Sequence, residues 1–157
     1  DLSPAGHQPM IAPNGNVIVF NGEIYNYREL QQRFFGDVQF RSSGDTEVLM
    51  KLYEKFGQQC VEYLNGMFAF AVWDARQRRA LIVRDRRGEK PLYVHERPGT
   101  VTFASELRAL VRSGAPSGAL SGPIVVSNTL AASTNKGPFY VAPTIASFAP
   151  ASVSVTP

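Results

Sequence analysis

Four short apolar segments separated by polar turns occupy the middle of the chain, and they restrict its fold more than any other feature. The segments are MFAFAVWD (67–74), ALIVRD (80–85), PLYVH (91–95) and VTFAS (101–105). The sequences between them, ARQRR, RRGEK and ERPGT, are rich in charge, and two of them contain glycine. Short β-prone segments joined by such turns are typical of antiparallel strands.

Upstream of these segments, strand and helix patterns alternate. Two short strands are predicted at Val17–Phe20 and Val38–Arg41. Apolar residues at helical spacing predict helices at Tyr27–Phe35, at residues 46–56 and at 59–64, and a further helix is predicted after the last of the four segments, at residues 106–111. Together these patterns predict an α+β domain with mostly antiparallel sheets and with helices packed outside them.

The composition of the chain changes near residue 112. Residues 1–112 contain 15 of the 16 Lys and Arg residues and all 13 Asp and Glu residues. Residues 113–157 contain one charged residue, Lys136, and six of the 11 prolines. We therefore expect a folded domain over residues 1–112 and a disordered, low-complexity tail over residues 113–157.

Charge, cysteine content and hydropathy argue against several classes of protein. A net charge of +3 gives no electrostatic case for a nucleic-acid partner, and no apolar run is long enough to predict a membrane span. The single cysteine, Cys60, excludes an internal disulfide and fits a cytoplasmic location. His7 and His95 lack partners at metal-ligand spacing, so no metal site is predicted. DLSPAGHQPM has neither an initiating Met nor the order of a signal peptide, which favours a fragment of a longer protein.

Asn21, Gly22 and Glu23 directly follow the first predicted strand. An asparagine side-chain N–H and the backbone N–H of a glycine can point at one substrate carbonyl, because glycine has no Cβ to block its approach. Two such donors would stabilise the oxyanion of an acyl-transfer intermediate, and Glu23 could hold a cationic group. The dipeptide by itself favours a tight turn, since Asn-Gly is the strongest short hairpin signal.

Asp45 and Cys60 also have structural interpretations. Asp45 stands where a helix N-cap is expected, and a carboxylate there could in addition bind a substrate ammonium group. Cys60 lies within a short predicted helix near Val61 and Leu64, which favours a buried structural thiol over a nucleophile.

Six segments carry a resemblance to a known family. They are DLSPAGHQPM, VIVFNGEIYNYREL, SGDTEVL, CVEYLNGMFAFAVWD, RDRRGEKPLY and FASELRAL. In this order they resemble the N-terminal glutamine-hydrolysing domain of glutamine-dependent asparagine synthetases, over about residues 1–112. The resemblance implies a four-layer αββα sandwich of the N-terminal-nucleophile hydrolase type.

The resemblance also implies a reaction and roles for four residues. In the family, a cysteine at the mature N-terminus attacks the side-chain amide of glutamine. The ammonia released passes to a second, ATP-using domain that amidates aspartate. Asn21 and Gly22 match the oxyanion-hole pair of the family, and Glu23 and Asp45 match the residues that hold the amino-acid head group of glutamine.

Other parts of the family pattern are expected outside these 157 residues. The nucleophilic cysteine and an arginine that grips the glutamine α-carboxylate would lie upstream of Asp1, and the synthetase domain with its ATP and Mg would lie downstream. We therefore expect this chain to be inactive alone and to bind no cofactor itself. Gly44 stands where the family usually has serine, a change that could loosen the turn before Asp45. Whether the intact protein is a homodimer stays open.

Two other functions also stay open at this point. One is an amidotransferase of the same class that serves another acceptor, such as a surface polysaccharide or a secondary metabolite. The other is a relic domain that no longer catalyses a reaction and is kept as an interaction module. The residues upstream of Asp1 would separate an enzyme from a relic, because Met-Cys-Gly at the true start favours an enzyme.

Overall fold

The computed structural model describes residues 1–97, 100–114 and 140–141. Its first half contains the 3₁₀ helix η1 (Pro4–Gly6), strands β1 (Met10–Ile11) and β2 (Val17–Ile24), helices α1 (Tyr27–Phe35) and α2 (Asp45–Phe56), and the 3₁₀ helix η2 (Gly57–Tyr63). Its second half contains strands β3 (Gly66–Asp74), β4 (Arg79–Arg84), β5 (Tyr93–Arg97) and β6 (Thr100–Ala104), helix α3 (Leu107–Arg112) and strand β7 (Tyr140–Val141).

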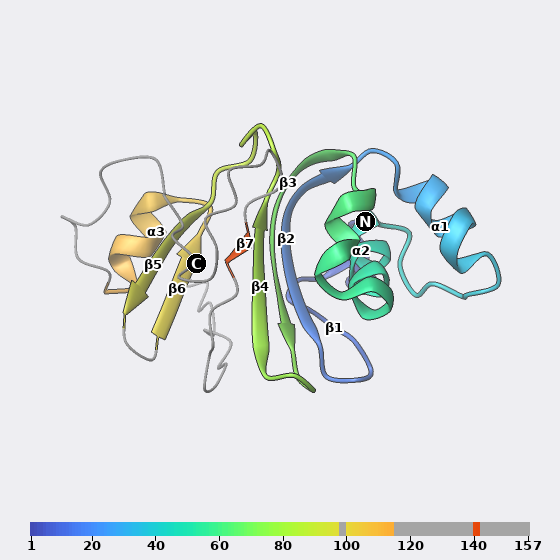
Figure 1. Ribbon diagram of the computed structural model, residues 1–157, viewed down its shortest axis with the longest axis horizontal. Coiled ribbons are helices and arrows are strands. Elements are labelled where there is room, and N and C mark those ends of the chain that lie inside the picture. The colour runs from blue at the N-terminus through green and yellow to red at the C-terminus, as the bar shows by residue number, and fades with distance from the viewer. Residues whose placement is uncertain (98–99, 115–139, 142–157) are drawn as a thin grey trace.

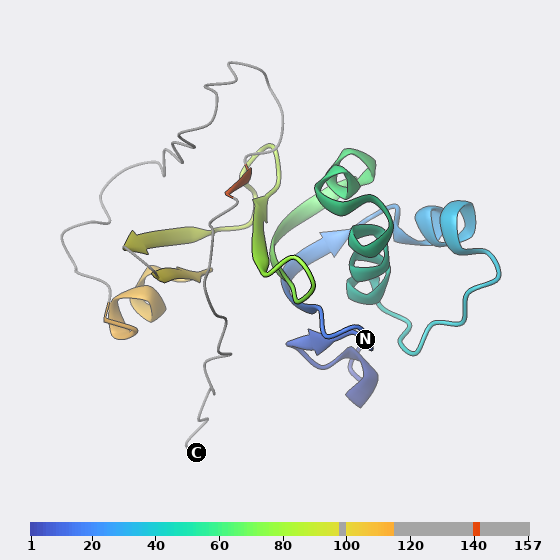
Figure 2. The ribbon, with the colours of Figure 1, turned by 60° about the horizontal axis from the view of Figure 1, so that its bottom comes forward.

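The elements form four layers. The larger sheet has the order β1-β2-β3-β4-β7, and β5 and β6 form a two-stranded sheet. All neighbouring strands in both sheets are antiparallel. Figure 1 shows α1 and α2 on one side of the larger sheet, and the two-stranded sheet with α3 on the other side. The turned view in Figure 2 keeps this arrangement, so the predicted α+β fold with the layer order αββα is confirmed.

The alternation of large and small residues along β3 explains how it sits between layers. Phe68, Phe70 and Val72 belong to the hydrophobic core that the sheet shares with α1 and α2. Ala69 and Ala71 alternate with them, so they project from the opposite face, and both are buried. Large side chains therefore fill the helix side of the sheet, while small ones line the side that faces the second sheet.

The predicted helices are present as α1, α2, the 3₁₀ helix η2 and α3. An aromatic cluster joins α1 to α2. The Phe34 ring of α1 packs edge-on against Phe56 of α2 at 5.0 Å between ring centroids. The Lys55 ammonium lies 5.4–5.6 Å from the rings of Phe34, Phe35 and Phe56. It also donates a hydrogen bond to the Phe34 carbonyl oxygen. Cation–π contacts of this kind add to the apolar packing that holds α1 against α2.

The strand predicted at Val38–Arg41 is wrong. These residues form an irregular connection between α1 and α2, and Val38 is 42% exposed. The carboxylate of Glu47 accepts hydrogen bonds from the backbone N–H groups of Arg41 at 3.1 Å and Ser42 at 2.7 Å. The Glu47 side chain thus accepts the backbone hydrogen bonds that a neighbouring strand would accept in a sheet.

The first predicted strand does not end at Phe20, and Asn21-Gly22 does not form a turn. β2 continues to Ile24, and Asn21–Ile24 pair with Gly66–Ala69 of β3. The apolar pattern stops at Phe20 because Asn21 and Glu23 are exposed and Gly22 has no side chain, whereas the backbone pairing continues to the buried Ile24.

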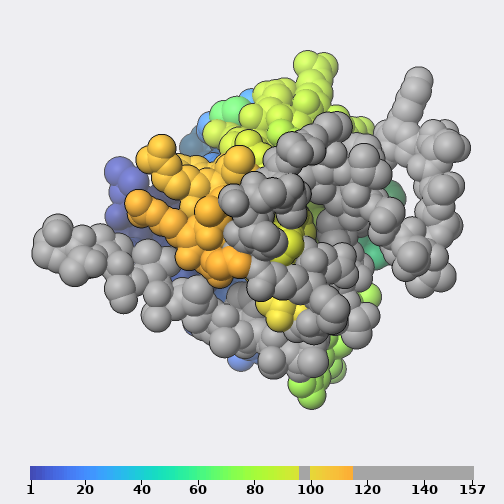
Figure 3. Space-filling model, turned by 90° about the vertical axis from the view of Figure 1, so that its left-hand side faces the viewer, coloured from blue at the N-terminus to red at the C-terminus, as the bar shows by residue number. Residues whose placement is uncertain are grey.

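The tail predicted over residues 113–157 lies outside the described residues apart from Ser113, Gly114 and β7. In β7, Val141 pairs with Ile82 and Tyr140 with Val83 of β4. Figure 3 shows α3 at the surface on the side of the molecule that carries the two-stranded sheet. Within the part of the chain that the structure describes, no helix is long and apolar enough to cross a membrane.

Candidate functional site

A cleft of about 320 Å³ lies along one edge of β2. It brings together three of the four residues predicted for the site, namely Asn21, Gly22 and Asp45. The other lining residues are Asp1, Gly6, Gln8, Met10, Phe20, Ser42, Gly44 and Thr46. Glu23 is an exposed residue of β2, and it is not among the residues that line this cleft.

Backbone donors along the edge of β2 face this cleft. β1 pairs only with Val17 and Ile18 of β2. Beyond it, the Phe20 N–H donates to Gln8 Oε1 at 2.6 Å and the Ile24 N–H donates to Asp45 Oδ2 at 2.9 Å. Alternate N–H groups of an antiparallel strand point to the same edge. The N–H of Gly22, midway between these two donors, is therefore directed into the cleft that Gln8 and Asp45 flank.

Two glycines set the path of the backbone at this point. Gly22 has φ +148°, and a Cβ added to it would collide with the Met67 carbonyl oxygen of β3. Gly66 has φ +159°, and a Cβ there would collide with the Glu23 carbonyl oxygen of β2. Any other residue at these two positions would be strained, both by the collision of its Cβ and by the backbone angles. The close approach of β2 and β3 therefore explains why glycine stands at both positions.

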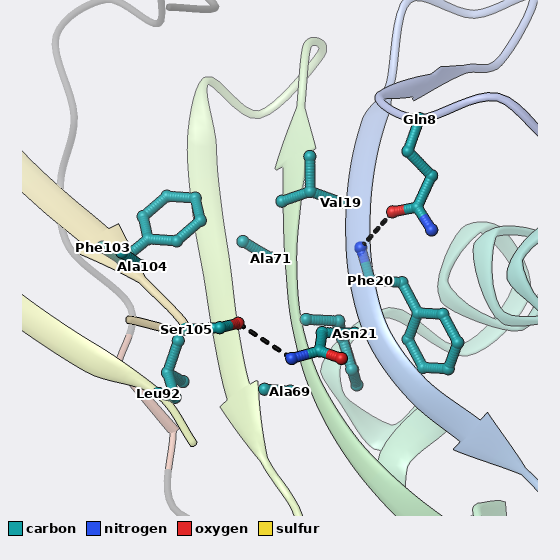
Figure 4. A pocket seen from close by; sticks show the side chains of 11 residues that line it. Gln8, Val19, Phe20, Asn21, Ala69, Ala71, Leu92, Phe103, Ala104 and Ser105 are labelled. Atoms are coloured by element: carbon teal, nitrogen blue, oxygen red, sulfur yellow. Dashed lines mark hydrogen bonds between the residues drawn. The ribbon is translucent and has the colours of Figure 1, made fainter. Parts of the chain in front are cut away.

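The side chain of Asn21 points to the second sheet. Its Nδ2 donates a hydrogen bond to Ser105 Oγ at 3.0 Å, and Figure 4 shows Asn21 and Phe20 directed to opposite sides of β2. Asn21 also lines a second cavity, of about 260 Å³, between the two sheets. Ala69 and Ala71 of β3 contribute to this cavity. Sequence reasoning did not single out Ser105, although the FASELRAL segment contains it.

Asp45 is not the N-cap of α2, so that structural interpretation is wrong. Gly44 is the N-cap residue, and Asp45 is the first residue of the helix. Its carboxylate lies in the first turn, where the helix dipole favours negative charge, and accepts the Ile24 N–H. Gly44 has φ −89° and ψ 166°, an extended conformation open to any residue. A serine at this position would offer a capping hydroxyl that glycine lacks.

Cys60 is a buried structural residue, as its spacing predicted. It is 0% exposed, and burial raises the pKa of its thiol to about 12.

We expect a thiol reagent at pH 7 to leave Cys60 unmodified in the folded chain and to react fully with it in denaturant, because the nucleophile is the thiolate. Mass spectrometry of both samples checks this result. Rapid modification of the folded chain would show that the thiol is accessible.

Among residues 1–97, 100–114 and 140–141, no group of three or more His, Cys, Asp and Glu side chains could hold a metal ion.

Comparison with known proteins identifies the family. The family described as "Glutamine amidotransferase domain" matches residues 1–156. The putative asparagine synthetase [glutamine-hydrolyzing] 2 of Methanocaldococcus jannaschii is 38% identical over 126 residues, which cover 71% of this chain and 24% of that protein. Asparagine synthetase [glutamine-hydrolyzing] 2 of Bacillus subtilis is 41% identical over 106 residues, which cover 67% of this chain and 14% of that protein.

A solved structure shows the same fold. Glutamine phosphoribosylpyrophosphate amidotransferase from B. subtilis aligns with a TM-score of 0.59 at 24% identity, over 68% of this chain and 26% of that one. The chain spans only about a quarter or less of the length of the two asparagine synthetases named above. The family match and the fold agree, and the chain belongs to the glutamine amidotransferase domain family, related to the N-terminal domains of asparagine synthetases.

Proposed function

We propose that this chain is the glutamine-hydrolysing part of an asparagine-synthetase-like ligase. The observation that carries the proposal is the meeting of Asn21, Gly22 and Asp45 around one cleft. This cleft combines a carboxylate with a backbone N–H that points into it. An amide substrate with an ammonium group at its other end, such as glutamine, matches both features.

In the proposed reaction, a cysteine thiolate supplied from outside these residues adds to the side-chain amide carbon of glutamine. The carbonyl oxygen becomes an oxyanion, which the Gly22 N–H and the Asn21 amide stabilise. As the oxyanion collapses to a carbonyl, the amide nitrogen takes up the proton that the cysteine thiol released and leaves as ammonia, which gives a glutamyl thioester. Water then adds to the thioester carbon, and the thiol leaves with the release of glutamate.

The carboxylates would hold the head group of the substrate. The Asp45 carboxylate has one oxygen bonded to the Ile24 N–H, so its other oxygen is left to accept from the glutamine α-ammonium group. Glu23 follows Gly22 on the same strand but does not line the cleft, so its contact with the ammonium group is proposed from the family resemblance alone. Both contacts are charge-assisted hydrogen bonds, the stronger kind.

The use of the ammonia is proposed from the named relatives, which are asparagine synthetases. A C-terminal domain that uses ATP and Mg would amidate aspartate in the cytoplasm, in a protein that could assemble as a homodimer. The same glutaminase site would equally serve another amide acceptor. Asparagine formation from aspartate, ATP and glutamine by the full-length protein tests this choice directly, and its absence beside normal glutamine hydrolysis would favour another acceptor.

Replacing Asp45 with asparagine tests the head-group site. We expect the KM for glutamine to rise about tenfold or more in the full-length protein, since a charge-assisted hydrogen bond contributes about 1.5–3 kcal/mol. The asparagine oxygen can still accept the Ile24 N–H, so the melting temperature should change little. Steady-state kinetics of glutamate release and thermal unfolding measure the two effects.

Asp37→Asn is the matched control, because Asp37 is an exposed carboxylate outside the cleft. An unchanged KM in Asp45→Asn would contradict the role of Asp45 in substrate binding.

The 157-residue chain alone is expected to release no glutamate, because its single cysteine, Cys60, is buried.

A further inference from the structure

We infer that Ser105 is a positioning residue that fixes the side-chain amide of Asn21 for oxyanion stabilisation. The inference rests on the proposed function, in which Asn21 supplies one of the two donors. Ser105 directly follows β6 and precedes Glu106, the N-cap residue of α3. The group that holds Asn21 therefore comes from the second sheet, 84 residues away along the chain.

The contact leaves one donor of Asn21 available for the substrate. The amide nitrogen carries two hydrogens, and one of them is directed to Ser105 Oγ at 3.0 Å. The second hydrogen of the same nitrogen can point to the oxyanion. Figure 4 shows the amide nitrogen turned to Ser105 and the amide oxygen turned away from it.

Without this contact, the amide would be free to rotate. The terminal torsion of asparagine is broad, and rotation by half a turn would exchange the nitrogen for the oxygen. An oxygen in that place would repel the negative charge that develops on the substrate. Ala69, which pairs with Asn21 on β3, has only a methyl group and cannot hold the amide by a hydrogen bond. The Ser105 hydroxyl thus restricts a torsion that its apolar neighbour leaves free.

The contact is suited to orientation more than to stability. Asn21 is an exposed residue and Ser105 is half-buried, so water can replace the hydrogen bond when it is lost. Loss of the hydroxyl should therefore affect turnover much more than folding. This difference separates a positioning role from a merely structural one.

Kinetics of glutamate release by the full-length protein provide the test. Ser105→Ala should lower kcat by about 10- to 100-fold, because misplacement of a catalytic group by about 1 Å has an effect of that size. The KM for glutamine and the melting temperature should stay close to those of the unchanged protein. Ser105→Thr, which keeps the hydroxyl, should recover most of kcat. Ser113→Ala is the matched control, since the Ser113 hydroxyl donates to the Leu110 carbonyl oxygen at the end of α3.

A double variant shows whether Ser105 acts through Asn21. If it does, Asn21→Ala combined with Ser105→Ala should be no slower than Asn21→Ala alone. If the losses of kcat in the two single variants multiply in the double variant, or if kcat is unchanged in Ser105→Ala, the inference about Ser105 is overturned. An unchanged kcat in Asn21→Ala would instead overturn the proposed role of Asn21. If Ser105→Ala does not fold, Ser105→Cys decides, because a thiol of similar size accepts only weakly: a lowered kcat supports the inference and an unchanged kcat refutes it.

Discussion

Replacing Asn21 with alanine is expected to lower kcat for glutamine hydrolysis by about 10²- to 10³-fold in the full-length protein, the usual effect of losing one oxyanion-hole donor. The KM should change little, because the donor acts on charge that exists only in the transition state. The Gly22 N–H would remain as the second donor and leave residual activity. Steady-state rates of glutamate release over a range of glutamine concentrations measure both constants.

Asn14→Ala is the matched control for this variant. Asn14 is an exposed residue whose Nδ2 donates to Glu54 Oε1 at 2.7 Å, and it does not line the cleft. Its removal should leave both kinetic constants unchanged. A change of KM alone in Asn21→Ala would show that this side chain binds the ground state and would contradict an oxyanion role.

Replacing Asp85 with alanine is expected to lower the free energy of unfolding by about 3 kcal/mol or more, a large effect for one residue. Asp85 is 4% exposed. Its carboxylate accepts the backbone N–H groups of Arg87, Glu89 and Lys90 at 2.9–3.0 Å, and that of Phe68 at 3.3 Å. Alanine would leave these donors without their acceptor. Urea unfolding at pH 7 measures the loss, and Asp37→Ala, at an exposed position, should change stability by less than about 0.5 kcal/mol.

The contribution of Asp85 should also depend on pH. Burial acts to raise the pKa of its carboxyl group, but the hydrogen bonds from Lys90, Glu89, Phe68 and Arg87 bring the pKa below its usual value. A lowered pKa in the folded state stabilises the protein above the unfolded value of about 3.9, and this stabilisation is lost as pH falls through the folded pKa. The penalty of Asp85→Ala should thus be smaller at about pH 3 than at pH 7. An equal penalty at both pH values would show that the charge of Asp85 contributes nothing.

Local patterns determined most of the secondary structure. Apolar residues at helical spacing predicted α1 and α2, and the short apolar segment MFAFAVWD before a polar turn predicted β3, because each pattern depends on neighbours along the chain. The strand predicted at Val38–Arg41 is wrong because a contact with a side chain outside this segment decided its structure. Val38 and Phe40 have the strand preference, but the N–H groups nearby are bonded by Glu47, a contact that β-propensity cannot express.

The sequence likewise predicted only part of the arrangement at the candidate site. The sequence placed Asn21, Gly22 and Glu23 together because they are adjacent, and the family resemblance added Asp45. The sequence could not show that Asn21 and Gly22 lie inside a strand, since their pairing partners, Ala69 and Phe68 of β3, are distant along the chain.

Only the tertiary structure decided how the donors of the site are held. Gln8 reaches the Phe20 N–H across 12 residues, Asp45 reaches the Ile24 N–H across 21, and Ser105 meets Asn21 across 84. Each contact joins elements that meet when the sheets and helices pack, and none leaves a periodic signal in the sequence. The sequence by itself determined which chemical groups are present and which helices form, because these depend on neighbours along the chain. The packing of the layers decided the orientation of those groups, because a hydrogen bond needs its two partners at a definite distance in space.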